Sequence, residues 1–114
     1  MVLYQEMPGQ WVGRGIEHDV TAEGRSIGET VRAVLRMLQA HIAFDERHDR
    51  EPLRNFRPAP QLYWNAYSAG TQVPLDQLGA LPPPHWEIAV AIARYRPMAA
   101  RPPIGSHASI SSSL

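Results

Sequence analysis

The sequence predicts an α+β domain in which an antiparallel sheet of about four strands carries one long helix, residues 26–44, on one face. Short β-favouring runs flank a turn signal at residues 8–9, and apolar residues recur every three or four positions after Ser26. Bulky and small residues then alternate over residues 86–95. The expected order within a domain of residues 1–96 is therefore three strands, the long helix, a short second helix and a last strand.

The first two strands are expected at residues 2–6 and 11–17, joined by the Pro-Gly turn at residues 8–9. Gly13 and Gly15 fall on the same face of the second strand. Glycines inside a strand often mark a place where another element comes close. The long helix is the expected neighbour here, and a partner chain is the alternative.

After a third strand at residues 20–23, Ser26 and Glu29 mark the start of the long helix. Their spacing is that of a capping box, in which each side chain accepts a hydrogen bond from a free backbone N–H. One apolar stripe then runs along the helix, formed by Ile27, Val31, Val34, Leu35, Leu38 and Ile42. A single stripe is buried against a single layer, which we expect to be the sheet.

Proline and glycine divide the second half of the chain. Residues 45–58 are rich in charge and bounded by prolines, so we expect a surface connection. A short helix follows at residues 60–69 and ends before Gly70. Residues 86–95 alternate as a strand does, although their alanine content also allows a helix. The Pro- and Ser-rich residues 97–114 are expected to form a disordered tail.

The composition indicates a single domain with no long-range charge. The chain has 114 residues, and 11 basic residues, all of them arginine, balance 11 acidic ones. We therefore expect neither direct DNA binding nor attraction to a membrane surface. The absence of cysteine excludes disulfides, thiol nucleophiles and Cys-based zinc sites. No apolar run is long enough to span a bilayer and no signal peptide is evident, so the expected location is cytoplasmic.

Glu17, His18 and Asp19 form the densest group of titratable side chains. Two carboxylates beside a histidine could perform acid–base chemistry or bind a metal. In an alternating strand, however, Glu17 and Asp19 share a face while His18 points away. We therefore expect a solvated turn at this position and assign no catalytic residue to it.

His41, Asp45 and His48 would line up on one face if the long helix continued past Phe44. Such a set could hold zinc or nickel, but a stable site needs further ligands and a buried surrounding shell. No nucleotide-binding, metalloprotease or calcium-loop motif is present in the sequence. We expect no metal and no other cofactor.

The order of features over residues 11–26 resembles the HicB-like antitoxin domain. A glycine-containing strand leads to the acidic pair Glu17 and Asp19, then to a polar strand that ends at Gly24, and Ser26 opens the helix in place of the usual threonine. The Pro-Gly turn of the family is replaced here by His-Asp-Val. The motif covers roughly residues 1–45 of the chain and the element order covers the whole domain. The family closes its sheet with a strand after the helical part, which favours the strand over the helix near the end of the domain.

The resemblance implies a degenerate ribonuclease-H-like fold and a non-enzymatic function. HicB-like antitoxins bind and neutralise HicA, a small toxin that cleaves messenger RNA. The expected partners are such a small basic protein and a second copy of this chain, paired through exposed sheet edges into a homo-oligomer. Glu17 and Asp19 are the residues we expect to contact a partner. Only 18 residues follow Arg96, too few for the DNA-binding module that many members of the family carry.

Two alternatives belong to other functional classes. A ribonuclease-H-like remnant with metal-dependent activity on nucleic acids would require Glu17, Asp19 and Glu23 to converge on Mg²⁺. A small-molecule module, homo-oligomeric, would use an apolar pocket lined by three tryptophans: Trp11, Trp64 and Trp86.

The aromatic residues of the short helix also have two interpretations. Tyr63, Trp64 and Tyr67 could form a binding platform. Rings that bury so much area more often attach a short helix to a core, and we expect that role here.

Deletion of residues 97–114 should leave the fold intact, because the segment has little apolar surface to bury. We expect the truncated chain to melt within a few degrees of the full chain, as measured by circular dichroism. A large fall in the melting temperature would show that the tail is part of the folded domain.

Overall fold

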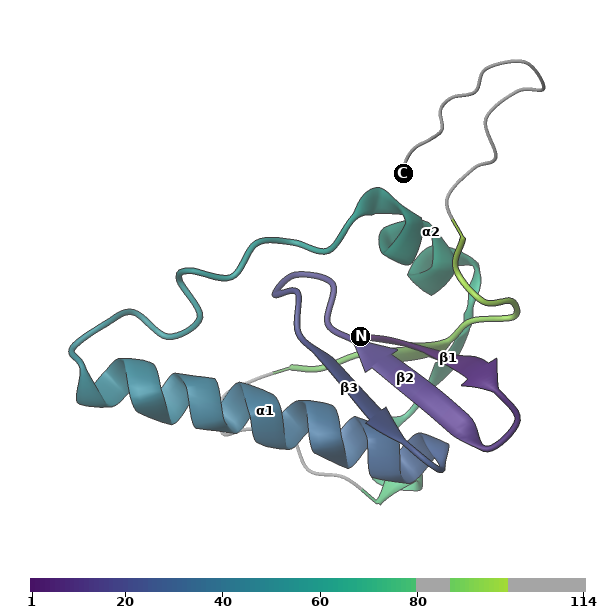
Figure 1. Ribbon diagram of the computed structural model, residues 1–114, viewed down its shortest axis with the longest axis horizontal. Helices are drawn as coiled ribbons and strands as arrows, with labels where there is room; N and C mark the ends of the chain where they lie inside the picture. Colours follow the sequence, from purple (N-terminus) through teal and green to yellow (C-terminus); the bar gives the residue numbers. More distant parts are fainter. Residues whose placement is uncertain (80–86, 99–114) are drawn as a thin grey trace, which may run out of the picture.

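The long helix and the sheet form two layers, and a short helix lies on the other side of the sheet (Figure 1). The computed structural model describes residues 1–79 and 87–98. Within them, five strands make one sheet in the order β3-β2-β1-β5-β4. The strands are Val2–Met7 (β1), Gln10–Arg14 (β2), Thr21–Gly24 (β3), Thr71–Val73 (β4) and Val90–Ile92 (β5).

The sheet is mixed, because β5 runs parallel to β1 whereas the other neighbouring strands are antiparallel. The α+β class is confirmed, and so is the strand, rather than a helix, within residues 86–95. The strand count differs slightly from the four expected, and the sheet is mixed rather than antiparallel throughout. β4 has only three residues, too few to show an alternating pattern in the sequence. β5 pairs antiparallel with β4 and therefore runs in the opposite direction to it. This is the direction of β1, so β5 pairs with β1 in parallel.

The long helix, α1 (Ile27–Arg47), starts as the capping box predicts and runs three residues past residue 44. The N–H of Glu29 donates to Ser26 Oγ at 3.1 Å. Four of the predicted stripe residues are buried, and α1 packs on the sheet face that carries Leu3 and Val90. A Cβ on Gly13 would lie 2.9 Å from Val34 Cγ2, so the neighbour that the strand glycine accommodates is the helix.

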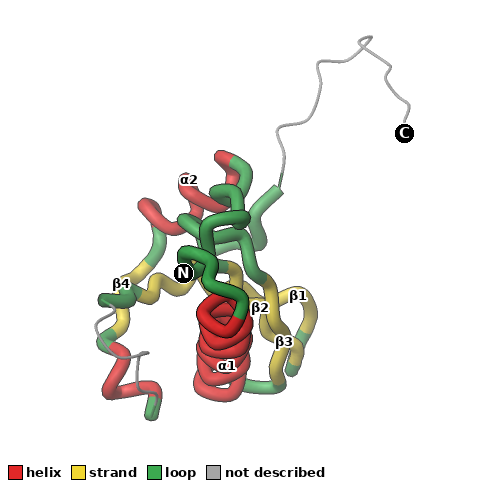
Figure 2. The backbone as a smooth tube through the Cα atoms, turned by 90° about the vertical axis from the view of Figure 1, so that its left-hand side faces the viewer, coloured by secondary structure: helices red, strands yellow, loops and turns green. Residues whose placement is uncertain are grey.

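The short helix, α2 (Gln61–Ala69), covers the opposite face of the sheet (Figure 2). Val2 and Tyr4 alternate with Leu3 along β1 and therefore point to this second face. Val2 packs in a second apolar cluster with α2, and the Tyr4 ring lies 6.2 Å from the Tyr63 ring. The three aromatic residues of α2 thus attach the helix to the sheet, as expected.

The connection between the two helices is not only a surface loop. Leu53 is 1% exposed and belongs to the core beneath α1, which contradicts the surface connection expected for residues 45–58. Its backbone adopts φ of 63°, a left-handed conformation that is costly for leucine. The Leu53 N–H donates to Asp45 Oδ2 at 2.9 Å. An isolated leucine between charged residues gives no periodic signal, so the pattern of the sequence could not indicate this anchor.

A 3₁₀-helix, η1 (Leu75–Leu78), follows β4 and adds Leu75 and Leu78 to the core on the α1 side. In the described part of the chain, no helix has the length and apolar character required to cross a bilayer. The predicted tail at residues 97–114 lies, apart from its first two residues, outside the described residues.

Asp45→Ala should lower the free energy of unfolding by about 1–2 kcal/mol, because the buried Leu53 N–H loses its acceptor. The matched control is Glu46→Ala, at an exposed neighbouring position, which should change stability by no more than about 0.5 kcal/mol. Urea denaturation of both variants measures the difference. Equal stabilities would mean that Asp45 does not hold the connection in place.

Candidate functional site

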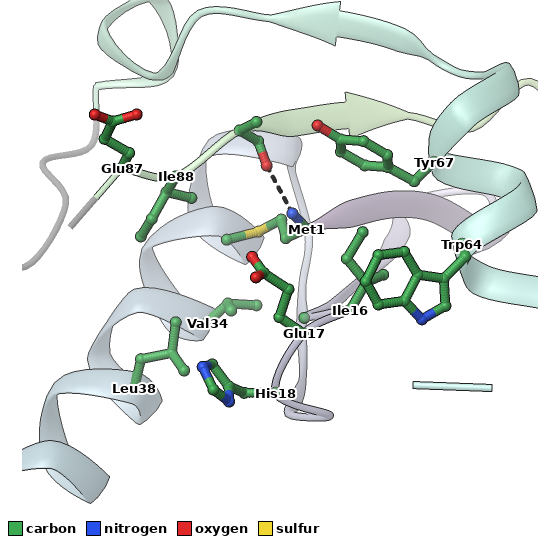
Figure 3. Close-up of a pocket in the computed structure, with 12 residues that line it drawn as sticks. Met1, Ile16, Glu17, His18, Val34, Leu38, Trp64, Tyr67, Glu87 and Ile88 are labelled. Atoms are coloured by element: carbon green, nitrogen blue, oxygen red, sulfur yellow. Dashed lines mark hydrogen bonds between the residues drawn. The ribbon is translucent and has the colours of Figure 1, made fainter. Parts of the chain in front are cut away.

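A cavity of about 460 Å³ opens at the end of the sheet where β1 and β5 begin. Five parts of the chain line it: the N-terminus, the loop after β2, helix α1, helix α2 and the residues just before β5 (Figure 3). Its wall is apolar where Val34 and Leu38 of α1 face it, and aromatic where Trp64 and Tyr67 of α2 do. The size is that of a small-molecule site, for which roughly 300–1,000 Å³ is usual.

The loop after β2 is tightly folded, and this folding places its side chains. The N–H of Gly15 donates to Val20 O at 2.8 Å, and the N–H of Val20 donates to His18 O at 2.7 Å. A Cβ on Gly15 would lie 2.5 Å from His18 O, so only glycine fits this turn. The Ala59 N–H bonds to Ile16 O and ties the loop to the start of α2. As a result Ile16 is buried, while Glu17 and His18 reach the cavity.

Asp19 has a different role from Glu17. Its carboxylate forms a two-point ion pair with Arg14, with Nε–Oδ1 at 2.7 Å and Nη2–Oδ2 at 3.0 Å. Hydrogen bonding to Asp19 raises the pKa of Arg14 above its usual value. The Arg14 guanidinium also lies 3.9 Å above the centre of the Tyr63 ring. Asp19 is therefore engaged within the chain, whereas Glu17 is exposed.

The expectation that Glu17 and Asp19 share a face while His18 points away is wrong. It assumed a strand through residue 17, but β2 ends at Arg14 and a loop follows. In this loop Glu17 and His18 line the same cavity, and Asp19 turns to Arg14 instead. The chain therefore bends after Arg14, and the alternating pattern of a straight strand does not predict such a bend.

The Met1 amino group lies at the inner side of the cavity and donates to Ala89 O at 2.6 Å. Burial lowers the pKa of this amino group to about 6, and the nearby Glu17 charge opposes the shift. Figure 3 shows the Glu17 carboxylate beside Met1, in the middle of the lining residues. An amine with such a pKa is mostly neutral at pH 7, so it cancels little of the Glu17 charge.

The predicted tryptophan pocket exists only in part. Trp64 lines the cavity, and its Nε1 donates to Ala59 O at 3.0 Å, which fixes the orientation of the indole. Trp11 packs against the core beneath α1 and does not line the cavity. Trp86 lies outside the described residues.

Two of the three carboxylates that a metal-dependent nuclease would require are engaged by other residues of the chain. Asp19 binds Arg14, and Glu23 accepts a hydrogen bond of 2.8 Å from Gln10 Nε2. Of the three, only Glu17 lines the cavity.

The histidine and aspartate residues of α1 also have internal partners. The ring of His41 packs edge-on at 4.8 Å from Phe56, and His48 Nδ1 lies 2.8 Å from Phe44 O. Asp45 holds the Leu53 N–H. Among residues 1–79 and 87–98, no group of three or more potential ligands could hold a metal ion.

Several residues of the cavity had no signal in the sequence. Met1, Glu87 and Ile88 come together with Glu17 only through the parallel pairing of β1 with β5. Neither periodicity nor a local motif reveals a contact between the two ends of a domain.

Comparison with family models, with curated proteins and with solved structures finds no match for this chain.

Stability should rise with pH between about pH 6 and pH 8 in a chain with a free Met1 amino group. The unfolded amine, with a pKa of 8.0, binds a proton in this range that the folded amine, with a pKa of about 6, releases. The stabilisation should reach roughly 2 kcal/mol above pH 8. Urea denaturation at a series of pH values measures it, and acetylation of the amine should reduce the slope. A flat profile would contradict the burial of this group.

Proposed function

We propose that this chain is a non-enzymatic, cytoplasmic binding domain that engages another protein along the outer edge of β3. Its partner is a small basic protein, a HicA-type toxin that cleaves messenger RNA, which the chain neutralises in the manner of a HicB-like antitoxin. The observation that carries the proposal is the position of β3 at the end of the sheet.

β3 is hydrogen-bonded on one side only. Within the described chain it pairs with β2, in a register that joins Val12 to Glu23 and Arg14 to Thr21. An edge strand presents unpaired N–H and C=O groups, and proteins commonly bind a partner strand at such an edge. The side chains of Thr21 and Glu23 are exposed, so they are accessible beside that edge.

The charge along this edge suits a basic partner. Glu17 lies in the loop that leads into β3 and Glu23 lies within the strand, and both carboxylates are exposed. Of the two arginines beside the edge, Arg14 is already neutralised by Asp19, whereas Arg25, directly after β3, is exposed. Complementary charge of this kind speeds association and selects the partner. Asp19 contributes indirectly in this proposal, because its ion pair holds the loop that presents Glu17.

The element order also supports the resemblance to HicB-like domains. Three strands lead into a helix capped by Ser26, and a last strand returns to the sheet after the helical part. The open edge of β3 also supports a homodimer as the second binding mode, since β3 of one copy can pair with β3 of another.

A second candidate function is binding of a small molecule. It is favoured by the cavity itself, which has an apolar wall from α1 and a fixed indole, Trp64. A cavity of this size with a few convergent polar groups is the usual form of a ligand site.

Reversing the charge beside β3 should weaken partner binding by at least about tenfold, because like charges then face the basic partner. The variant is Thr21→Arg with Glu23→Arg. The matched control is Gln72→Arg, which adds an arginine at an exposed position of β4, on the opposite edge. Capture of a small basic protein from the source cells, followed by assay of its RNA cleavage with and without the chain, measures the effect.

The proposal requires that the captured protein cleave RNA and that the native chain inhibit it. Capture unaffected by the β3 variant would move the binding surface elsewhere. Recovery of the chain alone, as a dimer by native mass spectrometry, would support self-association and contradict the toxin partnership.

A further inference from the structure

We propose that the cavity between α1, α2 and the loop after β2 binds a small organic cation, a primary or quaternary amine that carries an apolar or aromatic group. The inference rests on the second candidate function and adds the chemical class of the ligand. The cavity shares Glu17 with the proposed protein-binding surface, but no residue of β3 lines it.

The cavity presents apolar and charged groups together. Val34, Leu38 and Ile88 are aliphatic, and Trp64 and Tyr67 give it two aromatic rings. An amphiphilic molecule, with an apolar body and one charged end, matches this combination. The volume of about 460 Å³ suits a compact molecule rather than a polymer.

The charge at the cavity is negative. Glu17 and Glu87 both line it, and neither forms an ion pair within the described residues. Arg14, at the end of β2 just before the loop, is bound to Asp19. The Met1 amine is held largely neutral by burial. A cation therefore gains from the two carboxylates, whereas an anion of the same shape is repelled.

The aromatic rings reinforce this preference. In Figure 3, Trp64 and Tyr67 lie on one side of the Glu17 carboxylate and the aliphatic residues of α1 on the other. Both rings line the same cavity as Glu17, so a cation bound there can also contact an aromatic ring, and cation–π attraction then adds to the ion pair. The same protein already uses such a contact, since Arg14 lies 3.9 Å above the Tyr63 ring.

Three probes that share a phenylethyl group and differ in charge test the proposal. Phenethylamine is the cation, 2-phenylethanol the neutral analogue and 3-phenylpropionate the anion. Titration of the full-length chain is followed by amide chemical shifts in two-dimensional NMR. We expect millimolar binding of the amine, with the largest shifts in residues 15–18 and in α2, and much weaker binding of the anion.

Variants identify the carboxylate. Glu17→Gln should weaken amine binding by about fivefold and bring it close to that of the neutral analogue. The matched control is Glu46→Gln, an exposed carboxylate near the end of α1 outside the cavity, which should leave the affinity unchanged. Both positions are exposed, so both variants are expected to fold, and their melting temperatures verify it.

Each other outcome overturns part of the argument. Equal binding of all three probes at the cavity would leave the small-molecule function standing and refute the cationic class. Equal loss of affinity in both glutamate variants would also refute it, because the effect would then be one of net charge. Absence of shifts around the cavity with every probe would refute both the class and the small-molecule function.

Discussion

The close contact between α1 and β2 at Gly13 is the constraint on which the rest of this structure depends. A helix can lie so near a sheet only where the strand beneath it lacks a side chain, and here Val34, Leu3 and Thr30 all crowd the space that a Cβ would need. Gly24 repeats the arrangement at the start of α1, where Thr30 occupies the equivalent space. The two glycines therefore fix how deeply the helix sits. Because α1 lies this close to the sheet, Val34 and Leu38 form one wall of the cavity.

The second layer is fixed by polar contacts as well as by the apolar cluster under α2. Arg14 joins the loop after β2 to α2, because its guanidinium binds Asp19 on one side and the Tyr63 ring on the other. Backbone bonds from Asp19 to Arg57 and from Ala59 to Ile16 attach the same loop to the chain before α2. Partly buried, charge-assisted pairs of this kind specify one arrangement because their geometry tolerates little change. Glu17 owes its position at the mouth of the cavity to this network.

The sequence predicted the elements better than it predicted their arrangement. The helix start at Ser26, the turn at Gly9 and the strand glycine beneath the helix were all recognisable, since each follows from local backbone chemistry or a regular period. β4, the parallel pairing of β1 with β5 and the buried Leu53 were not, because each depends on contacts between distant segments. The site shares this limit. Glu17 was singled out for its charge, but its neighbours Met1 and Glu87 come from the two ends of the domain.

The place of β1 in the sheet has a consequence for how the protein is made. β1 is the middle strand, yet its partner on one side, β5, is the last of the described strands to be synthesised. The bond from the Ala91 N–H to Met1 O closes a loop that spans almost the whole domain. Until that closure, nascent chains expose one edge of the central strand and the part of the core that Val90 completes. Such long-range pairing slows folding and leaves the edge open to other chains, so synthesis of this protein has a vulnerable interval that ends only when β5 is in place.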